Sequence, residues 1–400
     1  MSQASVDRGQ APPAAAELEL TLGPVEPEVF FAKHWEREPL VVARSDPGRF
    51  DPILSLADAE RIVCETGIRT PAIRLVKEGE PIPAQTYTRD VGWGGGYFTG
   101  LARVDRVAEE YAAGATIILQ ALHLNWHPAA LYCRGLESSL GCPVQVNAYW
   151  TPATARGFNV HHDTHDVFIL QVAGRKRWQF YEPVVELPLK NQKWRHGLDD
   201  AGEPVADVML EPGDTLYLPR GCPHHATAEA GDSLHLTVGV NVQTRLDALM
   251  AALKNCEEDV EFRRSLEADG ELPDGLIDGL SARLSPEQVA RRARRRFVTG
   301  RNPVLDDQIA QVRHLDSLGL DDLLVRRSTV ISDLEETETG VVLHFEGKEV
   351  RFPAHAREAV VGAHTAGSAF TAADLPGALD GPGRLVLVRR LVREGFLRRL

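Results

Sequence analysis

Residues 147–178 read NAYWTPATARGFNVHHDTHDVFILQVAGRKRW, and this stretch decides both the fold and the candidate chemistry. It places His161 and Asp163 two residues apart among apolar and β-branched neighbours. Alternate residues of a β-strand point to the same face, so we expect an imidazole and a carboxylate side by side. Such a pair supplies two of the three ligands of the facial triad that binds non-haem Fe(II).

The third ligand should be a histidine on a later strand. Residues 213–224, GDTLYLPRGCPH, are typical of a turn, a short apolar strand and a second turn that ends at His224. We therefore favour His161, Asp163 and His224 as the metal ligands. The remaining positions on the metal are open to a keto acid and dioxygen.

Three neighbouring histidines leave alternatives to this ligand set. His162 points to the opposite face if the strand is regular. His165 shares the parity of Asp163, so alternation does not exclude it, and His225 competes with His224. A bare His-x-Asp also occurs by chance in many chains, so the later histidine and a nearby cation carry much of the argument.

Lys176 is that cation. It follows Gly174-Arg175, which indicates a turn between two apolar runs and places Lys176 one strand further on. By parity Lys176 shares its face with Trp178, and a cation there suits the distal carboxylate of a dicarboxylate cosubstrate. Arg220 is the alternative holder of that carboxylate. Together these residues predict an Fe(II)- and 2-oxoglutarate-dependent oxygenase.

The sequence resembles the JmjC-type ribosomal oxygenases, in the cupin-like branch of the 2-oxoglutarate oxygenases, over about residues 25–245. The resembling segments are 31–42 (FAKHWEREPLVV), 114–116 (GAT), 147–152 (NAYWTP), 157–158 (GF), 161–168 (HHDTHDVF), 171–178 (QVAGRKRW) and 212–224 (PGDTLYLPRGCPH). The resemblance implies that His161, Asp163 and His224 bind the metal and that Lys176 holds the far carboxylate of 2-oxoglutarate.

The same resemblance extends to the cosubstrate pocket, the substrate and the assembly. It places Asn147, Tyr149 and Thr151 near the cosubstrate pocket, and we carry over Asn147 as a binding residue. It also implies a substrate side chain that is an Arg or His of a ribosomal protein, and a homodimer formed through the helical region. His165 stands where relatives carry other residues, so the substrate-facing rim differs.

Composition agrees with a cytoplasmic protein of several domains. Four hundred residues are enough for two or three domains, and a formal net charge of −13 argues against a general nucleic-acid binder. Five cysteines without paired spacing indicate reduced thiols. The chain shows neither the pattern of a signal peptide nor an apolar run of membrane-spanning length.

Four regions follow from the patterning. Residues 1–17 are expected to be a disordered tail, and 18–244 a mainly β jelly-roll, the double-stranded β-helix of cupin and JmjC domains. Residues 245–327 are expected to be a helical dimerisation domain and 328–400 a winged-helix-like domain. We expect helices at 27–37, 55–66, 105–113, 286–298, 357–364, 371–379 and 384–399, strands at 329–332, 340–345 and 350–352, and a flexible loop at 92–96.

Two features of the tail bear on partners. Leu246, Leu249, Met250 and Leu253 form an apolar stripe at helical spacing, which we assign to burial within or between subunits. The run Arg291–Arg296 and the arginines of the last helix make nucleic-acid contact conceivable, although a solvated face balanced by nearby acids is the simpler interpretation.

Three other functions compete with a protein hydroxylase. A tailoring hydroxylase of a biosynthetic peptide or small metabolite would carry the same motifs. A non-catalytic metal-binding cupin with an interaction module would not need both the complete triad and Lys176. A winged-helix regulator with a sensing domain would bind nucleic acid at moderate salt.

Overall fold

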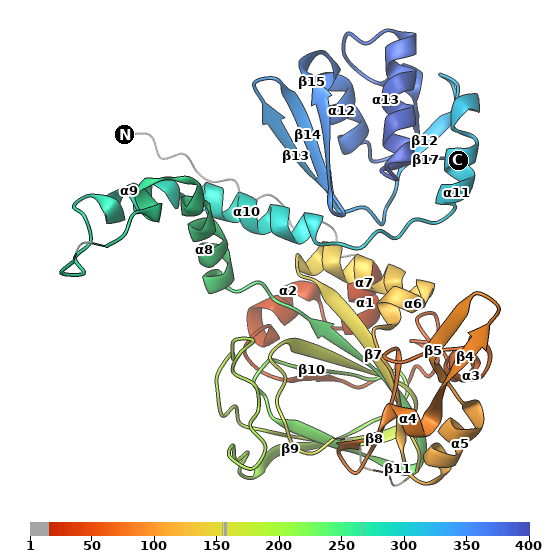
Figure 1. Cartoon of the computed structure of the whole chain (residues 1–400). Helices are drawn as coiled ribbons and strands as arrows, with labels where there is room; N and C mark the ends of the chain where they lie inside the picture. Colours follow the sequence, from red (N-terminus) through yellow and green to blue (C-terminus); the bar gives the residue numbers. More distant parts are fainter. Residues whose placement is uncertain (1–15, 154, 156–157, 267) are drawn as a thin grey trace. The chain divides into compact units, whose positions relative to one another are not determined.

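The computed structural model describes residues 16–400 except 154, 156–157 and 267, and it divides at Val242/Gln243 into two compact units (Figure 1). Most of the predicted disordered tail, residues 1–15, and Gly157 of the resembling segments lie outside the described residues. Residues 16 and 17 of that tail begin a helix instead. No helix among the described residues is long and apolar enough to cross a membrane.

Within the described residues of the first unit, nine strands form one antiparallel sheet. Its order is β1-β10-β8-β11-β7-β6-β2-β3, with β9 paired to β8. The strands are β1 Leu40–Val42, β2 Ile73–Lys77, β3 Glu80–Pro81, β6 Thr116–Leu119, β7 Val144–Thr151, β8 Asp166–Tyr181, β9 Pro204–Leu210, β10 Thr215–Leu218 and β11 His224–Val240. The mainly β prediction for this region is confirmed.

Strand β8 is buried on both faces, which explains its continuous apolar run. Phe168 and Leu170 pack into the large core, whereas Val167 and Ile169 pack into a smaller cluster with residues of β10. The predicted turn at 174–175 is wrong, because β8 runs on through Gly174. Gly174 has φ +62° beside an irregularity in the β8–β11 pairing, so it marks a bulge within one strand.

In the view of Figure 1, the helices of this unit lie above the sheet and to its right. They are α1 Ala16–Leu22, α2 Pro27–Val29 followed by a π-helical turn Phe30–His34, α3 Leu56–Glu65, α4 Ala84–Tyr87, α5 Val104–Ala112, α6 Leu122–Asn125 and α7 His127–Leu140. Helix α3 is confirmed, with Ser55 forming a capping box with Asp58. Sequence patterning missed α7, whose buried positions include Ala129, Tyr132 and Leu136.

The glycine-rich segment 92–96 is not a loop but the tip of a hairpin. Strand β4 (Thr88–Trp93) pairs with β5 (Gly96–Ala102), and Trp93 lies opposite Gly96. The two residues between them, Gly94 and Gly95, make a tight connection of the length that hairpins favour. The prediction of a flexible loop is therefore wrong for Gly92, Trp93 and Gly96, which lie in the two strands.

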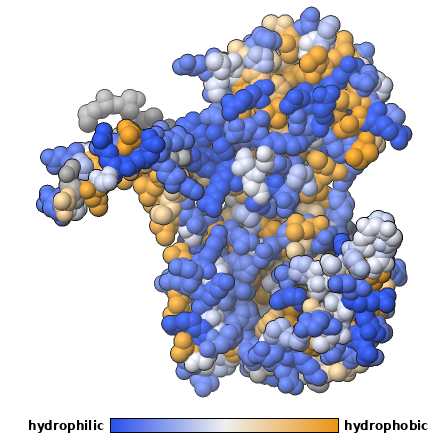
Figure 2. Space-filling model, viewed as in Figure 1, coloured by the Kyte–Doolittle hydropathy of each residue, from blue (hydrophilic) through white to orange (hydrophobic). Residues whose placement is uncertain are grey.

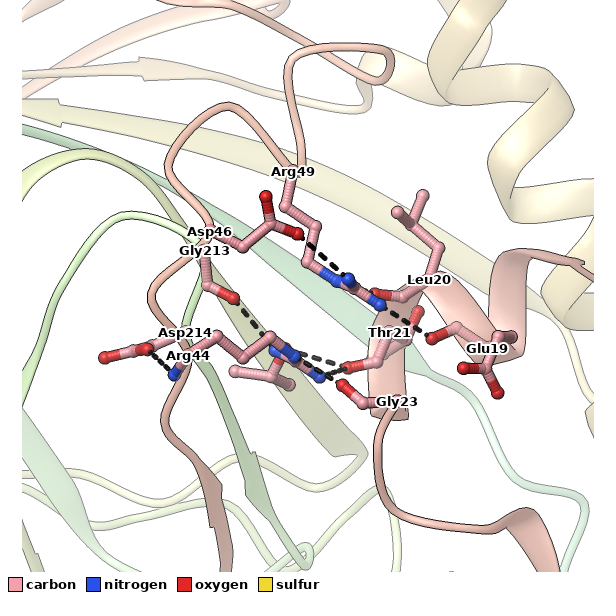
Figure 3. A network of polar contacts seen from close by, with 10 residues as sticks. Glu19, Leu20, Thr21, Gly23, Arg44, Asp46, Arg49, Gly213 and Asp214 are labelled. Carbon is pink, nitrogen blue, oxygen red and sulfur yellow. Dashed lines mark hydrogen bonds and ion pairs between the residues drawn. The ribbon is translucent and has the colours of Figure 1, made fainter.

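Two arginines cap the C-terminal end of α1 (Figure 3). The last carbonyls of a helix lack partners within the helix, and guanidinium groups can satisfy them. Arg44 and Arg49 both donate to this end. The accepting carbonyls belong to Glu19, Leu20, Thr21 and Gly23. Arg44 also donates to the carbonyl of Gly213 at 2.9 Å, which fastens α1 to the turn before β10.

The second unit contains helices and two small sheets (Figure 1). Its elements are α8 Arg245–Leu253, α9 Leu276–Arg283, α10 Pro286–Thr299, α11 Gln308–Arg313, β12 Leu323–Arg326, β13 Asp333–Thr337, β14 Gly340–Phe345, β15 Lys348–Pro353, α12 Arg357–Thr365, β16 Phe370–Thr371, α13 Gly381–Arg393 and β17 Leu397–Arg399. One sheet has the order β13-β14-β15 and the other β16-β12-β17.

Three predictions for this unit need correction. Residues 329–332 are not a strand, and the strand that precedes β14 begins at Asp333. Residues 371–379 are not a helix, because Thr371 lies in β16 and caps a single 3-10 turn. The last helix ends at Arg393, where Gly395 at φ +86° turns the chain into β17.

The arginines of α10 are partly balanced within the unit. Arg294 lies 3.6 Å from the carboxylate of Asp333, and Arg295 lies 2.7 Å from that of Glu335. On α13, Arg389 donates to the carbonyls of Asp316 and Leu318. These contacts support the interpretation of a balanced face over that of a nucleic-acid surface.

Candidate functional site

The sequence analysis predicted a strand at His161 and Asp163. This prediction is wrong, because β8 begins only at Asp166. His161 instead forms an isolated bridge with His224, in which the two backbone N–H···O distances are 3.2 and 2.9 Å. The amide of Gly221 donates to the carbonyl of Asp163 at 3.0 Å. Backbone pairing with the turn before β11, rather than alternation in a strand, therefore brings these side chains together.

The three predicted ligands converge. One ligand atom from each of His161, Asp163 and His224 lies within 4.8 Å of the others. The imidazole Nδ1 of His161 lies 2.8 Å from the carbonyl of Asn159, and that of His224 lies 3.0 Å from the carbonyl of Cys222. Because a carbonyl only accepts, each Nδ1 carries its proton and leaves Nε2 free to bind a metal.

The electrostatics of the group suit a divalent cation. Burial, aided by the neighbouring imidazole of His161, lowers the pKa of His224 to about 4. For Asp163, burial acts to raise the pKa, but the imidazoles of His165 and His224 outweigh it and lower the pKa overall. Neutral imidazoles and an ionised carboxylate are the protonation states that metal binding requires.

The other histidines of the motif have different surroundings. His162 is buried, and its Nε2 lies 3.0 Å from the carbonyl of Gln192. His225 Nδ1 lies 3.2 Å from the hydroxyl of Tyr181. His165 Nδ1 lies 4.0 Å from Asp163, and its ring occupies the space that a side chain at Gly239 would fill.

A cavity of about 410 Å³ adjoins the triad and contains Lys176. The ammonium donates to the hydroxyl of Thr151 at 3.0 Å, and burial lowers the pKa of Lys176 to about 7. Among the described residues, no carboxylate forms a hydrogen bond or ion pair with Lys176. Arg220, the alternative, does not line the cavity and pairs with Glu36 and Asp166 instead. A buried, uncompensated cation favours an anionic ligand.

Strand β7 supplies one wall of this cavity. Asn147, Tyr149 and Thr151 alternate along β7, and the first two line the cavity directly. The Asn147 side chain accepts the amide of Ala121 at 2.8 Å. Tyr149 stacks on His235 with ring centroids 5.0 Å apart.

Thr116 and His235 are among the cavity residues that the sequence analysis missed. Thr116 donates to the hydroxyl of Thr151 at 3.2 Å, and His235 lies opposite Tyr149 in the β11–β7 pairing. The signal for His235 was alternation along β11, where His235 and Thr237 lie between apolar residues. Thr116 is the one polar residue of β6 and gave no such signal.

Residues 121–248 match the JmjC domain family. The chain is 30% identical over 301 residues to human ribosomal oxygenase 1, covering 70% of this chain and 43% of that protein. It is 34% identical over 269 residues to the chicken ribosomal oxygenase 1, covering 64% and 43%. The chain is a JmjC-domain protein related to the ribosomal oxygenases.

The fold of this JmjC protein resembles that of the Escherichia coli ribosomal oxygenase YcfD. A structure of YcfD in complex with cobalt and 2-oxoglutarate has a TM-score of 0.56 and 18% sequence identity, and it covers 94% of this chain and 98% of that one. The architecture is therefore a JmjC/cupin β-sheet fold with helical segments and small C-terminal sheets. The chain spans less than half the length of the human and chicken relatives.

Proposed function

We propose that this JmjC protein is an Fe(II)- and 2-oxoglutarate-dependent oxygenase that hydroxylates a protein side chain. The convergence of His161, Asp163 and His224 beside the buried, uncompensated Lys176 carries the proposal. Two imidazoles and one carboxylate leave half of an octahedral metal open, and the adjoining cavity offers a cation for a dicarboxylate.

The protein residues have separable roles in this proposal. His161, Asp163 and His224 would hold iron, and Lys176 with Thr151 would hold the distal carboxylate of 2-oxoglutarate. When bound, iron and 2-oxoglutarate together activate dioxygen, and the keto acid is converted to succinate and CO₂ as one oxygen atom enters a C–H bond. The stacked Tyr149 and its neighbours make the cavity wall partly apolar, which strengthens the charge-assisted bond to Lys176.

The substrate proposal comes from the related proteins. The human relative is called a ribosomal oxygenase, and a relative from Drosophila erecta is called a bifunctional lysine-specific demethylase and histidyl-hydroxylase. We place the target as an Arg or His side chain of a ribosomal protein. A tailoring hydroxylase of a peptide or small metabolite is the alternative, and it would use the same triad.

Two measurements test the proposal. Purified protein with Fe(II) should convert 2-oxoglutarate to succinate, and mass spectrometry should find a protein side chain that gains one oxygen only in cells with the chain. The absence of succinate from iron-loaded protein would contradict the enzyme proposal. Oxygen gained by a metabolite or biosynthetic peptide alone would favour the tailoring alternative.

We also propose a homodimer through α8. Leu246, Leu249 and Met250 are exposed by 50%, 44% and 58%, and Figure 2 shows hydrophobic side chains gathered over this helix. The last member of the predicted stripe, Leu253, is half-buried. An apolar helix face left open within its own unit is suited to pairing with the same face of a second copy. Residues 245–327 would form this dimerisation domain and 328–400 a winged-helix-like domain.

Light scattering tests the dimer. Replacing Leu249 and Leu253 with Glu should convert a dimer into monomers with lowered activity on a macromolecular substrate, because charges would be buried at the interface. Exchanging the exposed Val386 of α13 for Glu is the matched control and should leave the dimer intact. A wild-type monomer at micromolar concentration contradicts the proposal.

A further inference from the structure

A second cavity of about 350 Å³ adjoins the triad from another side. Four residues line both this cavity and the one that contains Lys176. They are His161, Asp163, His165 and His196. Since Lys176 marks the larger cavity for the cosubstrate, the smaller one is left for a group of the substrate. Its outer wall carries Lys190, Lys193 and Trp194.

The turn that carries these lysines is fixed to the metal-site segment. The amide of Gln192 donates to the carbonyl of Leu189 at 2.8 Å, and the Gln192 side chain accepts the amide of Leu189 at 2.8 Å. His162 Nε2 donates to the carbonyl of Gln192 at 3.0 Å, and its ring meets Trp194 edge-on at 5.5 Å. His162, which no metal role explains, therefore anchors the turn next to His161.

The charges of this cavity are unbalanced. Neither Lys190 nor Lys193 forms a hydrogen bond or ion pair with any residue that the structure describes. The nearby carboxylate of Asp199 is engaged by Arg195 at 2.6 Å. Among the described residues that line the cavity, the one carboxylate belongs to Asp163, and a metal would neutralise it. With a metal bound to Asp163, the cavity therefore presents two amines and no unneutralised carboxylate of its lining residues.

We propose that Lys190, Lys193 and Trp194 form a substrate subsite for an acidic side chain of a polypeptide, next to the residue that is oxidised. The target chemistry rests on the proposed function, whereas the subsite rests on the cavity and its charges. Two amines match a single carboxylate, and Trp194 offers apolar surface to the neighbouring backbone. A long polyanion fits less well, because the whole chain carries a net charge of −13.

Peptide binding to the full-length protein tests this subsite. The probes are three fluorescently labelled Gly/Ser peptides with a central His, flanked by Glu, Gln or Lys. Their affinities are measured by anisotropy with Mn(II) and 2-oxoglutarate at low and at raised salt. The wild type should bind the Glu peptide about three- to tenfold more tightly than the Gln peptide, because two exposed ion pairs contribute modestly. Raised salt should reduce that preference.

Charge reversal supplies the decisive comparison. The variant Lys190→Glu/Lys193→Glu should prefer the Lys peptide, since a structural lesion would weaken all three peptides alike. Lys33→Glu changes an exposed lysine outside the cavity and should keep the preference for Glu. Equal affinities in the wild type, including no binding at all, or a preference that survives the reversal overturn the proposal. Succinate formation is measured separately, so a failed oxygenase and a failed subsite give different results.

Discussion

Lys176 and Arg220 are two buried cations of the same unit with opposite surroundings. Arg220 pairs with Glu36 and with Asp166 at 3.1 Å, and the Tyr217 hydroxyl donates to Asp166 at 2.7 Å. Burial acts to lower the pKa of Arg220, but the two carboxylates outweigh it and raise the pKa.

Lys176 lacks such compensation. Among the described residues it contacts one hydroxyl, and burial lowers its pKa from 10.5 to about 7. A buried charge is costly unless it is paired. The charge of Arg220 is therefore paired within the protein, and the Arg220 cluster (Arg220, Glu36, Asp166 and Tyr217) has a structural role. The charge of Lys176 remains available for a ligand. In the second unit, Arg295 also pairs with a carboxylate, that of Glu335, but both side chains are partly exposed.

The largest effect is expected where the metal would bind, next to Lys176. Asp163→Ala should reduce turnover of 2-oxoglutarate to background and weaken metal affinity by more than about 100-fold, since even outer-shell partners contribute about 10- to 100-fold. The fold should persist, because the Asp163 backbone carbonyl still accepts from Gly221. Metal titration and circular dichroism check this prediction.

Two further replacements decide the ligand set. His161→Ala and His224→Ala should lose metal, whereas His165→Ala and His225→Ala should retain it. The reverse pattern, or wild-type turnover by Asp163→Ala, would show that the convergent triad is not the metal site.

The next effect concerns stability and the Arg220 cluster. Arg220→Met leaves Asp166, which is fully buried, without its cation, and breaking such a pair costs about 3–5 kcal/mol in free energy of unfolding. Urea unfolding of the wild type and the variant measures the difference. Arg177→Met, which removes an exposed pair with Asp207, is the control and should have little effect. Equal stability of Arg220→Met and the wild type would mean that the ion pairs of Arg220 do not stabilise the protein, and Arg220 would then not differ from Lys176 in this respect.

Lys176→Met should behave in the opposite way. The affinity for 2-oxoglutarate should fall about 10- to 150-fold, the equivalent of about 1.5–3 kcal/mol for a hydrogen bond to a charged group. Stability without ligand should be unchanged or higher, because an uncompensated buried charge is removed. Calorimetric titration with 2-oxoglutarate measures the affinity, and Arg175→Met on the exposed face of β8 is the control. Unchanged affinity would mean that another residue holds the carboxylate.

The sequence analysis selected residues that the structure brings together at the site, but it did not predict the backbone conformation that brings them together. Alternation correctly placed Lys176 and Trp178 on the buried face of β8 and Arg175 on the exposed face. It gave the wrong reason for the convergence of His161 and Asp163, which depends on backbone pairing with a segment about sixty residues away. Such non-local pairing leaves no periodic signal in the segment itself.

The errors elsewhere have local causes. Gly92–Gly96 has the composition of a flexible loop, but strands on both sides pair across it. Residues 371–379 have helix-like spacing, but Thr371 lies in β16 and pairs with Leu323 of β12. Helix α7 was missed because its apolar positions lie within a region that otherwise alternates like strands. In the first two cases strand pairing overrides a weak local preference.

The effects of pH are the smallest when they are counted per pH unit, and the first is on stability. Below about pH 7, Lys176 is protonated in both the folded and the unfolded chain, so the cost of its burial is fully present. Between about pH 7 and 10.5 the folded chain has released this proton and the unfolded chain still binds it. Stability therefore rises with pH in this window, by at most about 1.4 kcal/mol per unit from this group. Urea unfolding at several pH values should show a rise that Lys176→Met lacks.

The affinity for 2-oxoglutarate should move in the opposite direction. The distal carboxylate needs the protonated ammonium of Lys176, and with a pKa of about 7 that form declines about tenfold for each pH unit above neutrality. Binding, measured calorimetrically with Mn(II) under nitrogen from pH 6.5 to 8.5, should weaken accordingly in the wild type. Lys176→Met should show a weak affinity that hardly changes over this range. Parallel pH curves for the two proteins would mean that the charge of Lys176 does not contribute to binding, and Lys176 would then differ from Arg220 only in lacking an ion pair within the protein.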